Sequence, residues 1–170
     1  MIEYNEYDEA IKKFASERNM SNVITNTEED STSIVQYFIQ YTKSNIIYMV
    51  LPTLVYDLIN KPEVVNAIED YLSSSDKKRL VIYLRDTSTM HRSLFETLIQ
   101  YSSQVIIRHL NGCELKDNNE TLKIITDAQT AYISIRGNNV RCNFYDKNSC
   151  QKLLKCIDTM KSNTKIVSLL

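Results

Sequence analysis

Basic side chains follow two apolar segments of the chain, at the points where predicted strands end. Arg85 comes directly after Leu80–Leu84, and Arg108 and His109 come directly after Val105–Ile107. In a parallel α/β sheet, ligands bind beyond the carboxyl ends of the strands, and the arginine fork matches the oxygens of a phosphate or a carboxylate. The sequence therefore predicts a ligand site at this edge of the sheet. The competing interpretation is that strand ends are polar because they meet solvent.

The spacing of histidine, cysteine and glycine residues does not indicate a metal site or a cofactor site. The two histidines, His91 and His109, form no HExxH or HxH motif, and Cys113, four residues after His109, adds only a second ligand. A metal site needs more ligands than two. The two glycines, Gly112 and Gly137, leave no Rossmann fingerprint and no P-loop. We therefore expect no metal and no cofactor.

Nucleophilic catalysis has one candidate, Cys150, because the sequence contains no GxSxG motif. Cys150 lies at the start of the predicted last helix, and a helix N-terminus lowers the pKa of a thiol. A free cysteine is more often a small buried hydrophobic residue. We favour this second interpretation for Cys150.

Composition and charge limit the class of protein. The chain of 170 residues carries 20 Lys and Arg against 21 Asp and Glu, a net charge of -1, which argues against a protein that mainly coats nucleic acid or anionic lipid. No segment reaches the roughly 18 apolar residues of a membrane helix, no signal peptide is visible and no CxxC pair occurs. These features predict a cytoplasmic protein with reduced thiols. Eleven tyrosines and no tryptophan favour a protein interface wherever the tyrosines are exposed.

Alternating apolar patterns predict one α/β domain over residues 1–170. Continuous apolar runs are typical of strands covered on both faces, and 3.6-residue spacing is typical of amphipathic helices. We predict a mixed, mostly parallel sheet of about six or seven strands, with helices on both faces and a C-terminal antiparallel hairpin that turns at Arg136–Asn139. The predicted strands are Ile46–Leu51, Leu80–Leu84, Val105–Ile107, Leu122–Thr126, Ala131–Ile135 and Val140–Phe144, with Val23–Ile24 as a candidate edge strand. The predicted helices lie near residues 7–18, 27–42, 62–72, 91–99 and 150–160.

The order of these elements resembles a phospholipase D-like domain over residues 20–165. In that family, one half-domain has a strand with the motif H-x-K-x4-D, then a hairpin, a strand ending near Asn-Phe, and a last helix. The corresponding stretch here is Thr121–Asp127, which contains Lys123, and Asn143-Phe144 leads into the predicted last helix. Thr121 stands where the family has its nucleophilic histidine, and the gap from Lys123 to Asp127 is one residue shorter than the motif requires.

The resemblance and its departures lead to two expectations. The first is a non-catalytic interaction or regulatory module that acts through a protein partner or its own homodimer, for which bacterial defence or toxin immunity is one setting. The alternative is a phosphodiester-acting, nuclease-like enzyme or a phosphate-ligand sensor with an unconventional site. The candidate ligand-binding residues are Arg85, Arg108, His109, Lys123 and Asp127, joined by His91 in the enzymatic version.

Overall fold

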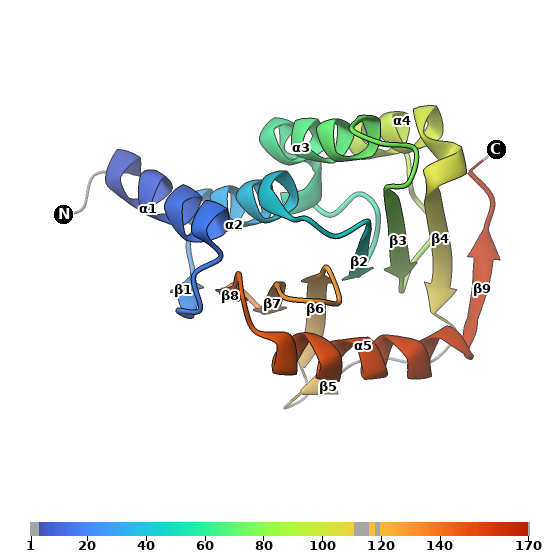
Figure 1. Cartoon of the computed structure of the whole chain (residues 1–170). Coiled ribbons are helices and arrows are strands. Elements are labelled where there is room, and N and C mark those ends of the chain that lie inside the picture. Colours follow the sequence, from blue (N-terminus) through green and yellow to red (C-terminus); the bar gives the residue numbers. More distant parts are fainter. Residues whose placement is uncertain (1–3, 111–115, 118–119, 170) are drawn as a thin grey trace.

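The computed structural model describes residues 4–110, 116–117 and 120–169, which form one mixed sheet with helices on both faces (Figure 1). Eight strands follow one another in the order β1-β8-β7-β6-β2-β3-β4-β9, and the short strand β5 pairs with the beginning of β6. The strands are β1 Val23–Thr25, β2 Ile46–Leu51, β3 Arg79–Leu84, β4 Val105–Leu110, β5 Lys116–Asp117, β6 Glu120–Thr126, β7 Tyr132–Arg136, β8 Asn139–Asn143 and β9 Thr164–Val167.

The expectation of a mostly parallel sheet is wrong. In the described sheet only β2–β3 and β3–β4 pair in parallel, and the other neighbours are antiparallel. Parallel neighbours need a crossover, which α3 and α4 supply between β2, β3 and β4. Strands β6, β7 and β8 are joined by tight turns and must therefore run antiparallel. The predicted hairpin between β7 and β8 is confirmed, with Arg136 opposite Asn139 and Gly137 at a φ of 54° in the turn.

The prediction of helices on both faces is confirmed. In the described part of the chain, four helices cover one face of the sheet and α5 crosses the other (Figure 1). The helices on the first face are α1 Tyr4–Glu17, α2 Glu28–Tyr41, α3 Pro62–Ser73 and α4 Ser93–Gln100, with the 3-10 turns η1 Leu58–Asn60 and η2 Ser102–Gln104 between elements; α5 is Lys147–Lys161.

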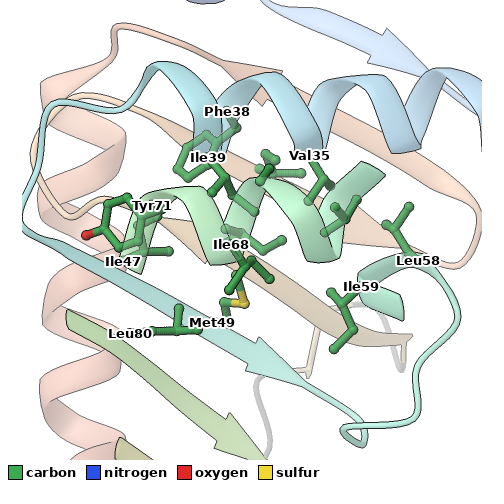
Figure 2. Close-up of a cluster of buried hydrophobic side chains, with 14 of the residues drawn as sticks. Val35, Phe38, Ile39, Ile47, Met49, Leu58, Ile59, Ile68, Tyr71 and Leu80 are labelled. Atoms are coloured by element: carbon green, nitrogen blue, oxygen red, sulfur yellow. The ribbon is translucent and has the colours of Figure 1, made fainter. Parts of the chain in front are cut away.

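The larger core lies between the sheet and the four helices. Figure 2 shows Phe38 of α2 and Ile68 of α3 packed over Met49 of β2, all of them buried. A smaller apolar layer lies under α5, where Ile157 meets Val50 of β2. Because both faces are covered, the central strands consist of apolar runs even where their neighbours are antiparallel. This burial fixes the strands and sets where their ends meet solvent.

Candidate functional site

The carboxyl ends of β3 and β4 bring Arg85 and His109 together, as the sequence predicts. Leu84 lies opposite His109 in the parallel register, so Arg85 is one residue beyond the end of β3. The Nε2 atom of His109 lies 3.2 Å from the carbonyl oxygen of Arg85. Since a carbonyl oxygen only accepts, this ring nitrogen donates its hydrogen, and the histidine is held against the end of β3.

The guanidinium of Arg85 extends across the end of β2 to strand β6. Its Nη2 donates to the carbonyl oxygen of Leu122 at 2.6 Å, while β2 lies between β3 and β6 in the sheet. The backbone N–H of Arg85 also donates to Leu51, the last residue of β2. Arg85 therefore fastens four strand ends, β4, β3, β2 and β6, into one edge.

Lys123 reaches the same edge from β6. Its Nζ lies 5.3 Å from the centre of the Tyr56 ring and 3.5 Å from the carbonyl oxygen of Gly137. A cation over an aromatic face is attracted by the ring quadrupole, so Tyr56 positions the ammonium group. Burial, with the nearby carboxylates of Asp57 and Glu28, raises the pKa of Tyr56, and the ring therefore stays neutral at physiological pH. The sequence pattern gives Tyr56 no special role at this edge, although this residue lies in the loop after the apolar run of β2.

Carboxylates also stand at this edge. Asp86 follows Arg85, and hydrogen bonds from the side chain and then the backbone of Ser88 lower the pKa of this exposed carboxyl; the charge of His109 contributes less. Two further carboxylates near Tyr56 have cationic partners. Asp57 pairs with Arg92, and Glu28 pairs with Lys61.

The other two candidate cations, Arg108 and His91, have different neighbours. Arg108 is opposite Tyr83, on the α5 face of the sheet, and its Nη1 donates to the hydroxyl of Thr164 in β9 at 3.3 Å. His91 lies before α4, and its exposed ring contacts Phe95 edge-on at 4.5 Å between centroids.

Asp127 lies at the opposite end of β6, away from the other candidate residues. It is 1% exposed, and its Oδ1 accepts from the backbone N–H groups of Gln129, Thr130 and Ala131 at 2.8–3.0 Å. Its Oδ2 accepts from the hydroxyl of Thr42 at 3.2 Å. The carboxylate therefore organises the turn between β6 and β7 and does not join the cationic edge.

The position that resembles the family's histidine lies at the start of β6. Thr121 directly precedes Leu122, the residue whose carbonyl accepts from Arg85. The backbone of Thr121 pairs with Lys116 of β5, whereas its side chain lies outside the described part of the chain. Cys113 lies outside the described residues as well.

Cys150 does not have the lowered pKa that a helix start provides. The residue is buried, and burial raises the pKa of its thiol to about 12. The hydroxyl of Thr126 lies 3.8 Å from its sulfur. The interpretation of Cys150 as a packed core residue is confirmed. Within the described ranges, no three His, Cys, Asp or Glu side chains gather as metal ligands, and no helix has the length and apolar character needed to span a membrane.

Comparison with known proteins relates the fold, but not the sequence, to other chains. No protein-family model and no curated protein matches this sequence. The structure is similar to a phospholipase D family member, Nuc from Salmonella typhimurium, with a TM-score of 0.56 and 11% identity over 86% of this chain and 99% of that one. It is also similar to NucT from Helicobacter pylori, with a TM-score of 0.57 and 12% identity over the same shares. The chain therefore has the phospholipase D fold, and the expected fold resemblance is confirmed.

Proposed function

We propose that the chain is a phospholipase D-like domain that binds a phosphodiester or a related phosphate-bearing ligand at the carboxyl ends of its parallel strands, without cleaving it through a phosphohistidine. One observation carries the proposal: Arg85 links the ends of β3 and β6, so that the cations Arg85 and Lys123 flank one edge. Hydrogen bonds from a charged donor to a phosphate contribute about 1.5–3 kcal/mol each, enough for two cations to dominate the recognition of an anion.

The non-catalytic part of the proposal rests on the histidines. Thr121 replaces the nucleophile expected from the family resemblance. The Nε2–H of His109 donates to the Arg85 carbonyl, so His109 is occupied in holding the strand ends. In this proposal His109 positions Arg85, and Arg85 and Lys123 contact the ligand.

Calorimetric titration with the dinucleotide dTpdT, which contains one phosphodiester, tests the proposal. Lys123→Ala is expected to weaken binding about tenfold, equivalent to about 1.4 kcal/mol. Lys77→Ala is the matched control, because Lys77 is exposed in the loop before β3, at the opposite edge. Equal affinities for wild type and Lys123→Ala, or no binding by wild type, would contradict the proposal.

Hydrolysis of a chromogenic phosphodiester separates binding from catalysis. We expect wild type and His109→Ala to release product at the same background rate. Turnover by wild type that disappears in His109→Ala would overturn the non-catalytic part of the proposal and favour the nuclease-like alternative.

A second candidate function, self-association, is favoured by the outer strand β9. This strand ends the described sheet and pairs there with β4, and Ile166 on it is 68% exposed. An open edge strand with an apolar side chain is a template for strand pairing, so we propose a homodimer formed through β9. Light scattering after size exclusion is expected to give a dimer for wild type and a monomer for Ile166→Asp; a monomeric wild type contradicts this candidate.

A further inference from the structure

Helix α5 covers only part of its face of the sheet. The buried apolar layer beneath α5 contains side chains of β2, β3, β4 and β6, and none of β7, β8 or β1. On the opposite face, the core under α1 to α4 does include these three strands, through Val23, Ile133 and Cys142. Within the described chain, the outer face of β7, β8 and β1 therefore lies beyond the layer that α5 covers.

A groove lies at this place, between α5 and the outer face of strands β6, β7 and β8. Its volume is about 430 Å³, and side chains of the first two turns of α5 form one wall. Strands β1, β8 and β7 are adjacent in the sheet, and two spacings between neighbouring strands measure about 10 Å. An α-helix with its side chains has a diameter of about 10–12 Å. The uncovered width therefore matches one helix.

Apolar side chains from three elements of the groove remain in contact with solvent. Ile24 of β1 is 71% exposed, and Leu122 of β6 and Leu153 of α5 are half-buried. Full burial of a leucine or isoleucine side chain is worth about 1.5–3 kcal/mol. A helix with apolar residues at positions i, i+4 and i+7 buries such a surface when it docks in a groove.

The charge around these apolar side chains is positive. Arg136, Arg141 and Lys152 line the groove and are exposed, whereas none of the described lining residues is acidic. The whole chain has a net charge of -1, so this concentration of positive charge is local. A cleft lined by one sign of charge attracts a partner of the opposite sign. The groove is therefore complementary to an acidic partner.

Each apolar side chain of the groove has a cation beside it. Arg141 is opposite Ile24 in the β1–β8 pair, and Arg136 is opposite Leu122 in the β6–β7 pair. On α5, the third cation directly precedes the third apolar residue. A ligand that carries only negative charge would leave the apolar side chains in water. The complementary surface is an apolar stripe with carboxylates along its sides.

We propose that this groove docks an acidic amphipathic helix of a protein partner. Apolar side chains of that helix contact Ile24, Leu122 and Leu153, and its aspartate and glutamate residues pair with the three cations. Three helical turns extend about 16 Å, which matches a five-residue strand such as β7 or β8 at about 17 Å. This interaction goes beyond the phosphodiester site and the homodimer proposed above, because it requires neither of them.

Fluorescence anisotropy with a labelled helical peptide tests the charge of the partner. The probe is an eighteen-residue alanine-based peptide with one stripe of leucines flanked by glutamates. Arg141→Glu/Lys152→Glu should bind this peptide at least tenfold more weakly than wild type, because like charges then face each other. The same variant should bind the lysine version of the peptide at least tenfold more tightly than wild type does.

The matched control for this charge reversal is Lys77→Glu/Lys155→Glu. Both lysines are exposed and lie outside the groove, and their replacement changes the net charge of the chain by the same amount. This variant should bind both peptides like wild type. An equal loss of the glutamate peptide in the two double variants would show attraction to the whole chain and would overturn the proposal.

A single substitution tests the apolar part of the groove. Ile24→Ser should weaken binding of the glutamate peptide about fivefold, because apolar surface is no longer buried on docking. Met20→Ser is the matched control, since Met20 is 70% exposed but does not line the groove. A peptide of the same composition with its leucines scattered around the helix should bind at least tenfold more weakly. Equal binding of the two peptides would contradict the proposal.

Other occupants of the groove are distinguishable in the same experiments. If a fifteen-residue oligothymidine displaces the peptide at a lower concentration than the unlabelled peptide does, the groove prefers nucleic acid. If wild type is a dimer by light scattering and Arg141→Glu/Lys152→Glu is a monomer, the occupant is a second copy of this chain. Either result overturns the proposal, as does the absence of any binding of the glutamate peptide to wild type.

Discussion

The two ends of strand β6 use charged residues in opposite ways. At one end Asp127 is buried and accepts from three backbone N–H groups and from the hydroxyl of Thr42. At the other end Lys123 lies over the ring of Tyr56, and Arg85 donates to Leu122. The four residues from Lys123 to Asp127 span about 13 Å of extended strand, so the two charges cannot meet on one ligand. Two residues of one sequence motif therefore have different roles, one in folding and one in the proposed recognition.

The largest effect is expected at the buried end. Asp127→Ala leaves three N–H groups of the β6–β7 turn without their acceptor, and each unsatisfied buried group costs about 1–3 kcal/mol. We expect the free energy of unfolding to fall by about 3 kcal/mol in urea denaturation. Asp127→Asn keeps an acceptor at the same position and should be milder. A loss below 1 kcal/mol for the alanine variant would show that the turn is held by other contacts.

A smaller effect is expected where a carboxylate organises a turn but is only half-buried. Asp146 is the N-cap of α5 and accepts from the backbone N–H of Ser149. Removal of an N-cap costs about 1 kcal/mol. Asp146→Ala should therefore lower the free energy of unfolding by about a third as much as Asp127→Ala does. Asp146→Asn keeps the cap and serves as its matched control. If the two alanine variants lost the same free energy of unfolding, burial of the carboxylate would not determine the size of the effect.

The pH dependence of stability should show the charge of Asp146. Its hydrogen bonds from Ser149 lower the pKa of the carboxyl in the folded state. The stabilisation is therefore complete above the unfolded pKa of about 3.9 and is lost as the pH falls through the lower folded value. The stability difference between wild type and Asp146→Asn should shrink on acidification below about pH 4, measured by thermal unfolding; a constant difference would contradict the role of the charge.

The smallest effect on stability is expected at the end of β6 where we propose ligand binding. Lys123→Ala removes a partly exposed cation–π contact, which contributes about 0.5–1 kcal/mol. We expect the free energy of unfolding to change by about 0.5 kcal/mol, even though the dinucleotide affinity falls tenfold. A loss of stability as large as that of Asp127→Ala would place both ends of β6 in the same structural role.

The sequence predicted the elements better than their directions. The apolar runs at Ile46–Leu51 and Leu80–Leu84 identified β2 and β3, because both strands are buried under helices on both faces. The same runs cannot reveal direction, since burial by helices does not depend on the direction of the neighbouring strand. Strand β9 was not predicted, because Thr164–Val167 is short and its burial pattern has no fully buried residue.

The site was predictable where it depends on position along a strand and unpredictable where it depends on the fold. Arg85 and His109 follow apolar runs, and parallel pairing places them side by side. Asp127 is held apart from Arg85 and Lys123 partly by its hydrogen bond from the hydroxyl of Thr42, a residue 85 positions away in the chain. The groove between α5 and strands β6 to β8 depends on the β7–β8 register and on the position of α5, neither of which a local pattern contains.

Strand β1 has a consequence for the order of folding. It pairs with β8, so that Val23 lies opposite Cys142, and β2 is flanked on one side by β6. During synthesis, the residues of β1 and β2 therefore leave the ribosome well before those of β8 and β6, their antiparallel neighbours. Until strands β6 to β8 have been synthesised, the sheet that packs against helices α1 to α3 lacks these antiparallel strands. Contacts between distant segments slow folding, and the last third of the chain is therefore the part whose synthesis completes the domain.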